Sequence, residues 1–226
     1  MAIEFYKNTD TPLIRGILFD MDGLVLDTEK LYARFWMEAC HFYGFPMTMV
    51  QALRMRAANT QLGAARLREF FGPEADYTTI RTKRVELMDA FIAEQGVEPK
   101  AGIYELLDFL EERGIPAAIC SASPTERIRE YLGALGLFHR FAAICSGYDV
   151  PHGKPAPDIY LHGAAALNLK PEECLALEDA PLGIESAFRA GCVPVMIPDQ
   201  DQPDTDTAAM LYAKADSLRD IIDLLK

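Results

Sequence analysis

Two carboxylates stand two residues apart in this chain, between an apolar segment and a glycine. They are Asp20 and Asp22 in the run Asp20-Met21-Asp22-Gly23, which follows the apolar residues 16–19. An extended backbone points residues i and i+2 to the same side, so both carboxylates are expected to face one pocket. Gly23 can supply the backbone freedom that a turn needs. Paired acids at a strand end suit a hard cation and a phosphoryl group, although the run alone fits a solvated turn or a calcium loop equally well.

Three later segments each place a polar residue of matching chemistry just after an apolar run. Ser121 carries a hydroxyl that can donate to a phosphate oxygen, and Lys154 is a point cation suited to phosphate. Glu178 and Asp179 form a second acidic pair, with Pro181 opening a helix behind it. An acid pair, a hydroxyl, a lysine and a second acid pair are what a magnesium-dependent phosphoryl-transfer site requires.

In this order the four motifs resemble those of the haloacid dehalogenase superfamily. The matching residues are Asp20-x-Asp22-Gly23 with Asp27-Thr28, then Ser121, then Gly153-Lys154-Pro155-x-Pro157-Asp158, then Glu178-Asp179-Ala180-x-x-Gly183. The similarity is greatest to the branch that contains β-phosphoglucomutase and small-molecule phosphatases such as pseudouridine-5′-phosphatase. It extends over essentially the whole chain, and four ordered motifs are far more specific than any one of them.

The pattern of apolar runs predicts an α/β fold. Five short apolar runs alternate with helical patterns, which is typical of a parallel sheet buried on both faces. We therefore expect a doubly wound, Rossmann-like core. The predicted strands are residues 16–19, 117–120, 142–145, 175–177 and 193–197, the predicted helices between them are 125–132, 158–167 and 182–190, and residues 198–206 are expected to form a surface loop.

Residues 28–96 repeat apolar positions at helical spacing and contain no strand-like run. The resemblance implies that they form a mobile helical cap inserted into a core made of residues 1–27 and 97–226, with hinges near Asp27 and Gly96–Pro99. The cap is expected to set substrate specificity. Its cationic candidates for a distal substrate group are Arg54, Arg56, Arg66, Arg68, Lys83 and Arg84, and the sequence singles out none of them because charged residues on an amphipathic helix usually face water.

The resemblance also assigns catalytic roles. It implies that Asp20 is the nucleophile that forms an aspartyl phosphate, and that Asp22 protonates the leaving oxygen and later takes a proton from water. Lys154 is expected to neutralise charge shared by Asp20 and the phosphoryl oxygens. Ser121 and the backbone N–H groups of Met21 and Ala122 are expected to hold those oxygens.

A magnesium ion is the expected cofactor. Mg²⁺ prefers near-octahedral oxygen ligation and usually retains water. The resemblance implies that the carboxylates of Asp20 and Asp179 and the backbone carbonyl of Asp22 bind it. Glu178 is expected either to bind the ion directly or to orient a water molecule that does.

Three functions remain open at this point, with hydrolysis of a small phosphate monoester favoured. Members that resemble β-phosphoglucomutase carry a histidine ten residues after the second motif aspartate, where this chain has Tyr32. An arginine expected on the next cap segment also has no counterpart near Ala58 or Asn59. A sugar phosphomutase is therefore the second hypothesis. A non-catalytic phosphometabolite-binding protein is the third, because such a protein should have lost at least one of the motif residues.

Composition limits the partners. The 226 residues carry a net charge of −12, which opposes nonspecific attraction to nucleic acid or to an anionic membrane. We expect a small phosphorylated metabolite as the partner and a monomer as the assembly. The five cysteines are scattered and are interpreted as buried free thiols. Together with the lack of a signal peptide or a long apolar stretch, they predict a cytoplasmic protein.

Overall fold

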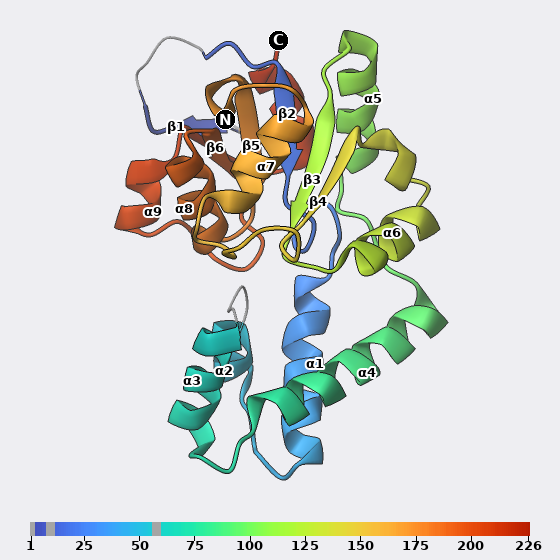
Figure 1. The fold of residues 1–226 in the computed structure, drawn as a ribbon, viewed down its shortest axis with the longest axis vertical. Helices are drawn as coiled ribbons and strands as arrows, with labels where there is room; N and C mark the ends of the chain where they lie inside the picture. The colour runs from blue at the N-terminus through green and yellow to red at the C-terminus, as the bar shows by residue number, and fades with distance from the viewer. Residues whose placement is uncertain (1–2, 8–11, 56–59) are drawn as a thin grey trace. The chain divides into compact units, whose positions relative to one another are not determined.

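The computed structural model describes residues 3–7, 12–55 and 60–226. The chain forms two compact units, one of residues 1–26 and 99–226 and the other of residues 27–98. Figure 1 traces both along the chain. Three positions considered from the sequence, Arg56, Ala58 and Asn59, lie outside the described residues. No helix within those described ranges is both long enough and apolar enough to span a bilayer.

The first unit is built on a seven-stranded sheet with the strand order β1-β7-β6-β5-β2-β3-β4. The described strands are parallel except for β1, which pairs antiparallel with β7 at one edge. Their bounds are β1 (Ile3–Phe5), β2 (Gly16–Phe19), β3 (Ala117–Ser121), β4 (Ala143–Ser146), β5 (Cys174–Glu178), β6 (Val193–Met196) and β7 (Ala213–Ala215).

The three central strands β5, β2 and β3 are buried along their whole length, as expected of apolar parallel strands covered on both faces. The predicted doubly wound α/β core is confirmed. Two corrections concern its edges: the sequence did not indicate β1 and β7, and the third predicted strand begins one residue later than expected, at Ala143. Strands β3 and β4 follow on one side of β2, and β5, β6 and β7 follow on the other, so the strand order reverses next to β2. Doubly wound sheets bind ligands at the carboxyl ends of the strands at such a point.

Helices α7 and α8 pack on one face of this sheet (Figure 1). The core between them and the strands is formed by small and medium side chains, among them Leu18, Cys120, Cys145, Tyr160 and Ala187. The helices of the unit are α5 (Ile103–Arg113), α6 (Thr125–Ala134), α7 (Asp158–Ala166), α8 (Pro181–Ala190), α9 (Thr205–Met210) and α10 (Ile221–Leu224), with 3₁₀ turns at Phe138–Arg140, Pro171–Glu173 and Leu218–Asp220.

All five cysteines are buried and free, as the sequence predicted. Cys120 and Cys145 are register partners on β3 and β4, and both belong to the core beneath α7. The Cys120 side chain therefore lies on the face of the sheet that α7 covers, and strand alternation directs the next side chain, Ser121, to the other face.

The second unit is entirely helical in its described residues. It contains α1 (Glu29–Phe42), α2 (Met49–Arg54), α3 (Thr60–Phe71) and α4 (Tyr77–Gln95). Helix α1 packs along α4, and a core of its own includes Trp36, Leu67, Tyr77 and Ile80. Thr48 caps α2 in a capping box and Asp76 caps α4, each through a side-chain oxygen that accepts a backbone N–H.

Candidate active site

The carboxyl ends of β5, β2 and β3 bring three of the four predicted motifs to one edge of the sheet. Asp20 directly follows β2, Ser121 ends β3, and Glu178 ends β5. These strands are neighbours in the sheet, so residues more than 150 positions apart in sequence meet here. The backbone N–H of Asp20 donates to the carbonyl of Leu177 at 3.0 Å, which continues the β2–β5 pairing up to the site.

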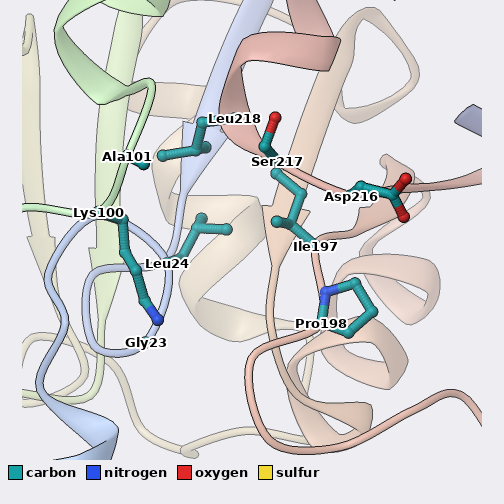
Figure 2. A pocket seen from close by; sticks show the side chains of 9 residues that line it. All are labelled: Gly23, Leu24, Lys100, Ala101, Ile197, Pro198, Asp216, Ser217 and Leu218. Atoms are coloured by element: carbon teal, nitrogen blue, oxygen red, sulfur yellow. The ribbon is translucent and has the colours of Figure 1, made fainter. Parts of the chain in front are cut away.

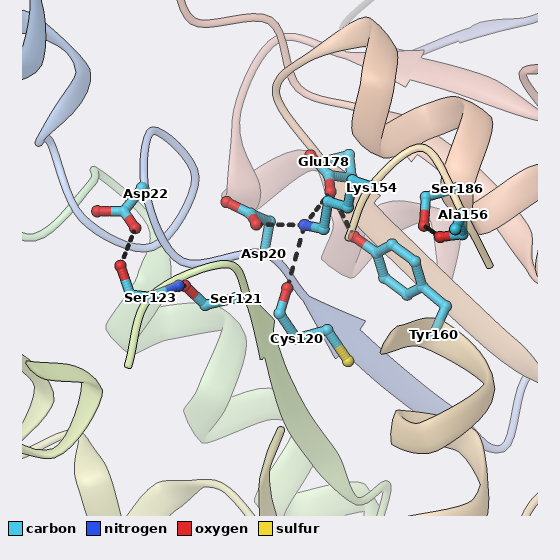
Figure 3. A network of polar contacts seen from close by, with 10 residues as sticks. All are labelled: Asp20, Asp22, Cys120, Ser121, Ser123, Lys154, Ala156, Tyr160, Glu178 and Ser186. Atoms are coloured by element: carbon cyan, nitrogen blue, oxygen red, sulfur yellow. Dashed lines mark hydrogen bonds and ion pairs between the residues drawn. The ribbon is translucent and has the colours of Figure 1, made fainter. Parts of the chain in front are cut away.

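Lys154 joins these strand ends through its ammonium group. Its Nζ lies 2.5 Å from Oδ1 of Asp20 and 2.6 Å from Oε1 of Glu178, and it also donates to the carbonyl oxygen of Cys120 at 3.1 Å (Figure 3). The lysine comes from the loop between β4 and α7, and its bond to Pro155 is cis. A single cation therefore contacts groups on β2, β3 and β5.

Tyr160, on α7, is a site neighbour that the sequence analysis missed. Its hydroxyl donates to Oε1 of Glu178, the same oxygen that Lys154 contacts, and its ring lies beneath the Lys154 ammonium at 5.1 Å. The tyrosine is fully buried. Two donors therefore hold one oxygen of the Glu178 carboxylate, and an aromatic face supports the lysine between them.

Three carboxylates gather at this edge. Oxygens of Asp20, Glu178 and Asp179 lie within 4.8 Å of one another, and all three residues are buried. Three acids against one ammonium leave an excess of negative charge in a buried, all-oxygen donor set. This is the chemistry that a hard divalent cation prefers, so the cluster could hold a metal ion.

The same crowding of charge perturbs the ionisation of the cluster. Burial raises the pKa of Asp20 to about 8; Lys154 opposes this rise, while the carboxylates of Glu178 and Asp22 add to it. For Lys154, burial alone would lower the pKa, but the facing charges of Asp20 and Glu178 hold it above its ordinary value. The lysine is therefore a permanent cation at neutral pH.

Asp22 has a neighbour that the sequence did not indicate. The strand ends at Phe19 and the chain turns within the motif, with Gly23 at a φ of +88°. The Ser123 hydroxyl donates to Oδ2 of Asp22 at 3.1 Å (Figure 3), and the charge of Asp22 raises the pKa of Asp20. Asp22 itself pairs with Leu26 in an isolated β-bridge, and a pocket shared by Asp20 and Asp22 stays a prediction.

Three groups predicted to bind phosphate, the Ser121 hydroxyl and the N–H groups of Met21 and Ala122, lie at this edge and can each donate a hydrogen bond. The Ser121 hydroxyl accepts the N–H of Ser123 at 3.1 Å, so its own proton can go to another acceptor. Within the described ranges, neither the N–H of Met21 nor that of Ala122 donates to a protein acceptor. These three donors can serve an anion bound next to Asp20.

A small pocket of about 140 Å³ lies beside the Gly23 turn, toward β6 and β7 (Figure 2). Its walls include Leu24, Ile197 and Leu218, with Lys100 and Asp216 as the charged residues. It contains none of the carboxylates of the acidic cluster, and Lys100 is itself paired with Asp199 at 2.7 Å. The pocket is therefore distinct from the acidic cluster.

The helical unit holds the remaining candidate cations. Arg54 pairs with Glu69 at 3.0 Å and Lys83 with Glu86 at 2.9 Å, both at exposed carboxylates. Arg66 donates to the carbonyl of Arg54, and Arg68 is exposed on α3. Arg84 differs from these because it is buried, with its guanidinium 4.8 Å from the ring of Tyr32 and 5.6 Å from that of Trp36.

Comparison with known proteins identifies the family. Residues 14–191 match the haloacid dehalogenase-like hydrolase family, and this range contains both acidic pairs, Ser121 and Lys154. The chain belongs to that family.

Several members of the haloacid dehalogenase-like family are similar over most of the chain. Fructose-1-phosphate phosphatase YqaB of Escherichia coli is 30% identical over 176 residues, which cover 78% of this chain and 92% of that protein. Hexitol phosphatase A of Escherichia coli is 34% identical over 183 residues, covering 79% and 80%. Relatives named as β-phosphoglucomutase and as pseudouridine-5′-phosphatase also match, so the resemblance seen in the motifs is confirmed.

The fold of the family is also found in solved structures. CbbY from Rhodobacter sphaeroides, solved in complex with phosphate, is 25% identical, with a TM-score of 0.75 over 92% of this chain and 96% of CbbY. The α/β core and the helical segment thus agree with those of a haloacid dehalogenase-like protein.

Proposed function

We propose that this chain is a Mg²⁺-dependent phosphatase that hydrolyses a small phosphate monoester, such as a sugar phosphate or a nucleoside monophosphate, through an aspartyl-phosphate intermediate. The observation that carries the proposal is the contact of one buried ammonium, on Lys154, with both Asp20 and Glu178 beside Asp179. The names of the related phosphatases support the substrate class.

The donor set fits magnesium. The Asp20 and Asp179 carboxylates and the backbone carbonyl of Asp22 would hold the ion, with Glu178 either binding it or orienting a water molecule. When bound, the ion would supply positive charge against the phosphoryl oxygens. Because Lys154 and Tyr160 already share Oε1 of Glu178, the second oxygen of that carboxylate is the one left for such a role.

The reaction would proceed in two displacements at phosphorus. A carboxylate oxygen of Asp20 forms a bond to phosphorus as the ester P–O bond breaks, and Asp22 gives its proton to the departing alkoxide oxygen. A water molecule then attacks the phosphorus of the aspartyl phosphate, the Asp22 carboxylate takes a proton from that water, and the P–O bond to Asp20 breaks. Inorganic phosphate leaves, and Asp20 and Asp22 return to their starting states.

The remaining donors hold the phosphoryl oxygens. Lys154 already contacts Asp20, so a phosphoryl group on that carboxylate would remain within its field. The Ser121 hydroxyl and the N–H groups of Met21 and Ala122 supply neutral donors at the same edge. Preorganised donors of this kind stabilise the charge that develops on the equatorial oxygens.

We propose a separate role for each of the two units. Residues 1–26 and 99–226 would carry the chemistry, and the helical residues 27–98 would act as a cap that selects the substrate. The net charge of −12 supports a metabolite rather than a nucleic acid or an anionic membrane as the partner. We further propose a monomer that works in the cytoplasm, since five buried free thiols fit a reducing compartment.

A sugar phosphomutase is the second candidate, supported by the relatives named as β-phosphoglucomutase. A mutase must keep water from its aspartyl phosphate while a bisphosphorylated intermediate turns around. In this chain Tyr32 occupies the cap position where the resemblance leads us to expect a histidine, and its ring packs on Arg84. A neutral phenol cannot act as a cationic gate near neutral pH, which favours hydrolysis.

The test is a phosphate-release screen on a panel of sugar phosphates and nucleoside monophosphates with Mg²⁺. We expect turnover of at least one class by the wild-type chain and a loss of at least about 1,000-fold in Asp20→Asn, which keeps the shape but lacks the nucleophile. Asp216→Asn, an exposed acid of the same unit, is the matched control. Residual activity of Asp20→Asn within about tenfold of wild type would rule out covalent catalysis by Asp20.

A further inference from the structure

Ser123 connects the serine-rich end of β3 to Asp22. It is buried, with 6% of its surface exposed, and its hydroxyl donates to Oδ2 of Asp22 at 3.1 Å (Figure 3). The two residues are 101 positions apart in sequence. The contact lies wholly within the first unit.

The backbone of Ser123 is held on both sides by hydroxyl groups of neighbouring strands. Its N–H donates to Oγ of Ser121 at 3.1 Å, and its carbonyl accepts the hydroxyl of Ser146 at 2.8 Å. Ser121 and Ser146 are register partners at the ends of β3 and β4. The direction of the Ser123 side chain is therefore set by the sheet itself, even though Ser123 lies beyond the strand.

These contacts give Ser121 and Ser123 different hydrogen-bond acceptors. Ser123 has one hydroxyl proton, and that proton is given to Asp22. Ser121 accepts from the Ser123 N–H, so its own proton can be given to a phosphoryl oxygen. Ser123 is thus suited to act on Asp22 and not on the phosphoryl group.

We propose that Ser123 is a positioning residue that orients the Asp22 carboxyl group for its two proton transfers; this rests on the proposed function. The hydrogen bond engages Oδ2 and restricts the rotation of the Asp22 side chain next to the Gly23 turn. The carboxyl group oriented in this way gives its proton to the alkoxide and later receives one from water. The hydroxyl proton of Ser123 stays on Ser123 throughout.

Substrates with different leaving groups can test the role of Ser123. An alkoxide needs a proton as it departs, whereas an acidic phenolate such as 4-nitrophenolate leaves without one. In single-turnover experiments we expect Ser123→Ala to slow alcohol release from an alkyl phosphate, the best substrate of the screen, by about 10- to 100-fold. Nitrophenolate release from 4-nitrophenyl phosphate should change by less than about threefold, and KM for the alkyl phosphate should stay within about twofold.

Two variants control for loss of a hydroxyl. Ser123→Thr keeps the donor and should restore alkyl phosphate turnover to within a few-fold of wild type. Ser217→Ala removes another serine-to-aspartate hydrogen bond, from Oγ of Ser217 to Asp220 at 2.7 Å, and should leave both substrates unaffected. Circular dichroism and thermal melting should show that each variant is folded.

Other outcomes would overturn the proposal. Equal losses for both substrates would mean that Ser123 only supports the local structure, and a loss confined to KM would make it a substrate ligand. Asp22→Asn separates this failure from that of the proposed function. If Asp22→Asn slows alkyl phosphates selectively while Ser123→Ala does not, only the role of Ser123 is wrong; if neither does, the acid role of Asp22 is wrong as well.

Discussion

The first turn of α8 packs against the carboxylate of Glu178 at Gly183. A Cβ placed on Gly183 would lie 2.0 Å from Cδ and Oε1 of Glu178 and 2.2 Å from Oε2. Only a glycine therefore lets the helix approach the acid that Lys154 and Tyr160 hold. The glycine of the fourth motif is explained by this close approach, since its φ is not in the left-handed region.

This relationship yields a first prediction, with a matched pair of substitutions. Gly183→Ala should lower kcat/KM by about 100-fold, because the Glu178 carboxylate must shift and take Lys154 with it. Gly133→Ala, in α6, places its Cβ where no atom lies within 4 Å, and should stabilise the protein by about 0.5–1 kcal/mol at unchanged activity. Measurements of kcat/KM and of the melting temperature for both variants test these expectations. Equal activity in the two would show that the packing at Gly183 does not position Glu178.

The second prediction concerns the missed tyrosine. Tyr160→Phe keeps the ring beneath Lys154 but removes one of the two donors to Oε1 of Glu178, and should lower kcat by about 5- to 30-fold. Tyr160→Leu also removes the ring and should lose more. The control is Tyr104→Phe. The Tyr104 hydroxyl donates to the carbonyl of Leu135 at 3.1 Å, and its removal should leave full activity. Wild-type kcat in Tyr160→Phe would show that the Lys154 contact alone holds Glu178.

The third prediction concerns the metal. Excess EDTA should abolish phosphate release and added Mg²⁺ should restore it, whereas Ca²⁺ should bind without supporting turnover because its looser coordination misplaces nucleophile and phosphorus. Asp179→Asn should raise the Mg²⁺ concentration for half-maximal activity by at least about tenfold. Calorimetric titration of each ion gives the affinities. Full activity in EDTA would contradict the proposed role of the acidic cluster.

The fourth prediction separates phosphatase from mutase. Supplied with β-glucose 1-phosphate and a trace of the 1,6-bisphosphate, the enzyme should release free phosphate faster than it forms glucose 6-phosphate. Tyr32, with an unperturbed pKa of about 10, gives no cationic gate against water near neutral pH. Coupled assays for the two products, run in parallel, make the comparison. Faster accumulation of the isomer would make the mutase the better interpretation.

Much of this site could be predicted because Asp20, Ser121 and Glu178 each stand at the carboxyl end of a buried apolar strand. Parallel strands end at a common edge, so the sequence places Asp20, Ser121 and Glu178 near one another without further information. The rest depends on the turns. The sequence could not give the contact of Asp22 with Ser123, because both residues lie beyond the ends of their strands, β2 and β3.

The two missed residues lack a distinctive sequence signal of their own. Tyr160 occupies an apolar position on α7 and is typical of core packing, and its hydroxyl gains meaning only where the helix meets Glu178. Ser123 stands two residues after Ser121, a spacing that could have drawn attention, but it points to Asp22 only because Ser121 and Ser146 hold its backbone. The edge strands β1 and β7 were missed because each has only three residues.

The most direct test of the central claim is chemical trapping of the intermediate. Borohydride added during turnover reduces an aspartyl phosphate to homoserine, which peptide mass spectrometry can locate in the chain. We predict homoserine at position 20 in the wild-type protein with its best substrate and Mg²⁺, and none when substrate or Mg²⁺ is omitted. An unmodified Asp20 during continuing phosphate release, or homoserine at position 22 instead, would contradict the claim that Asp20 is the nucleophile.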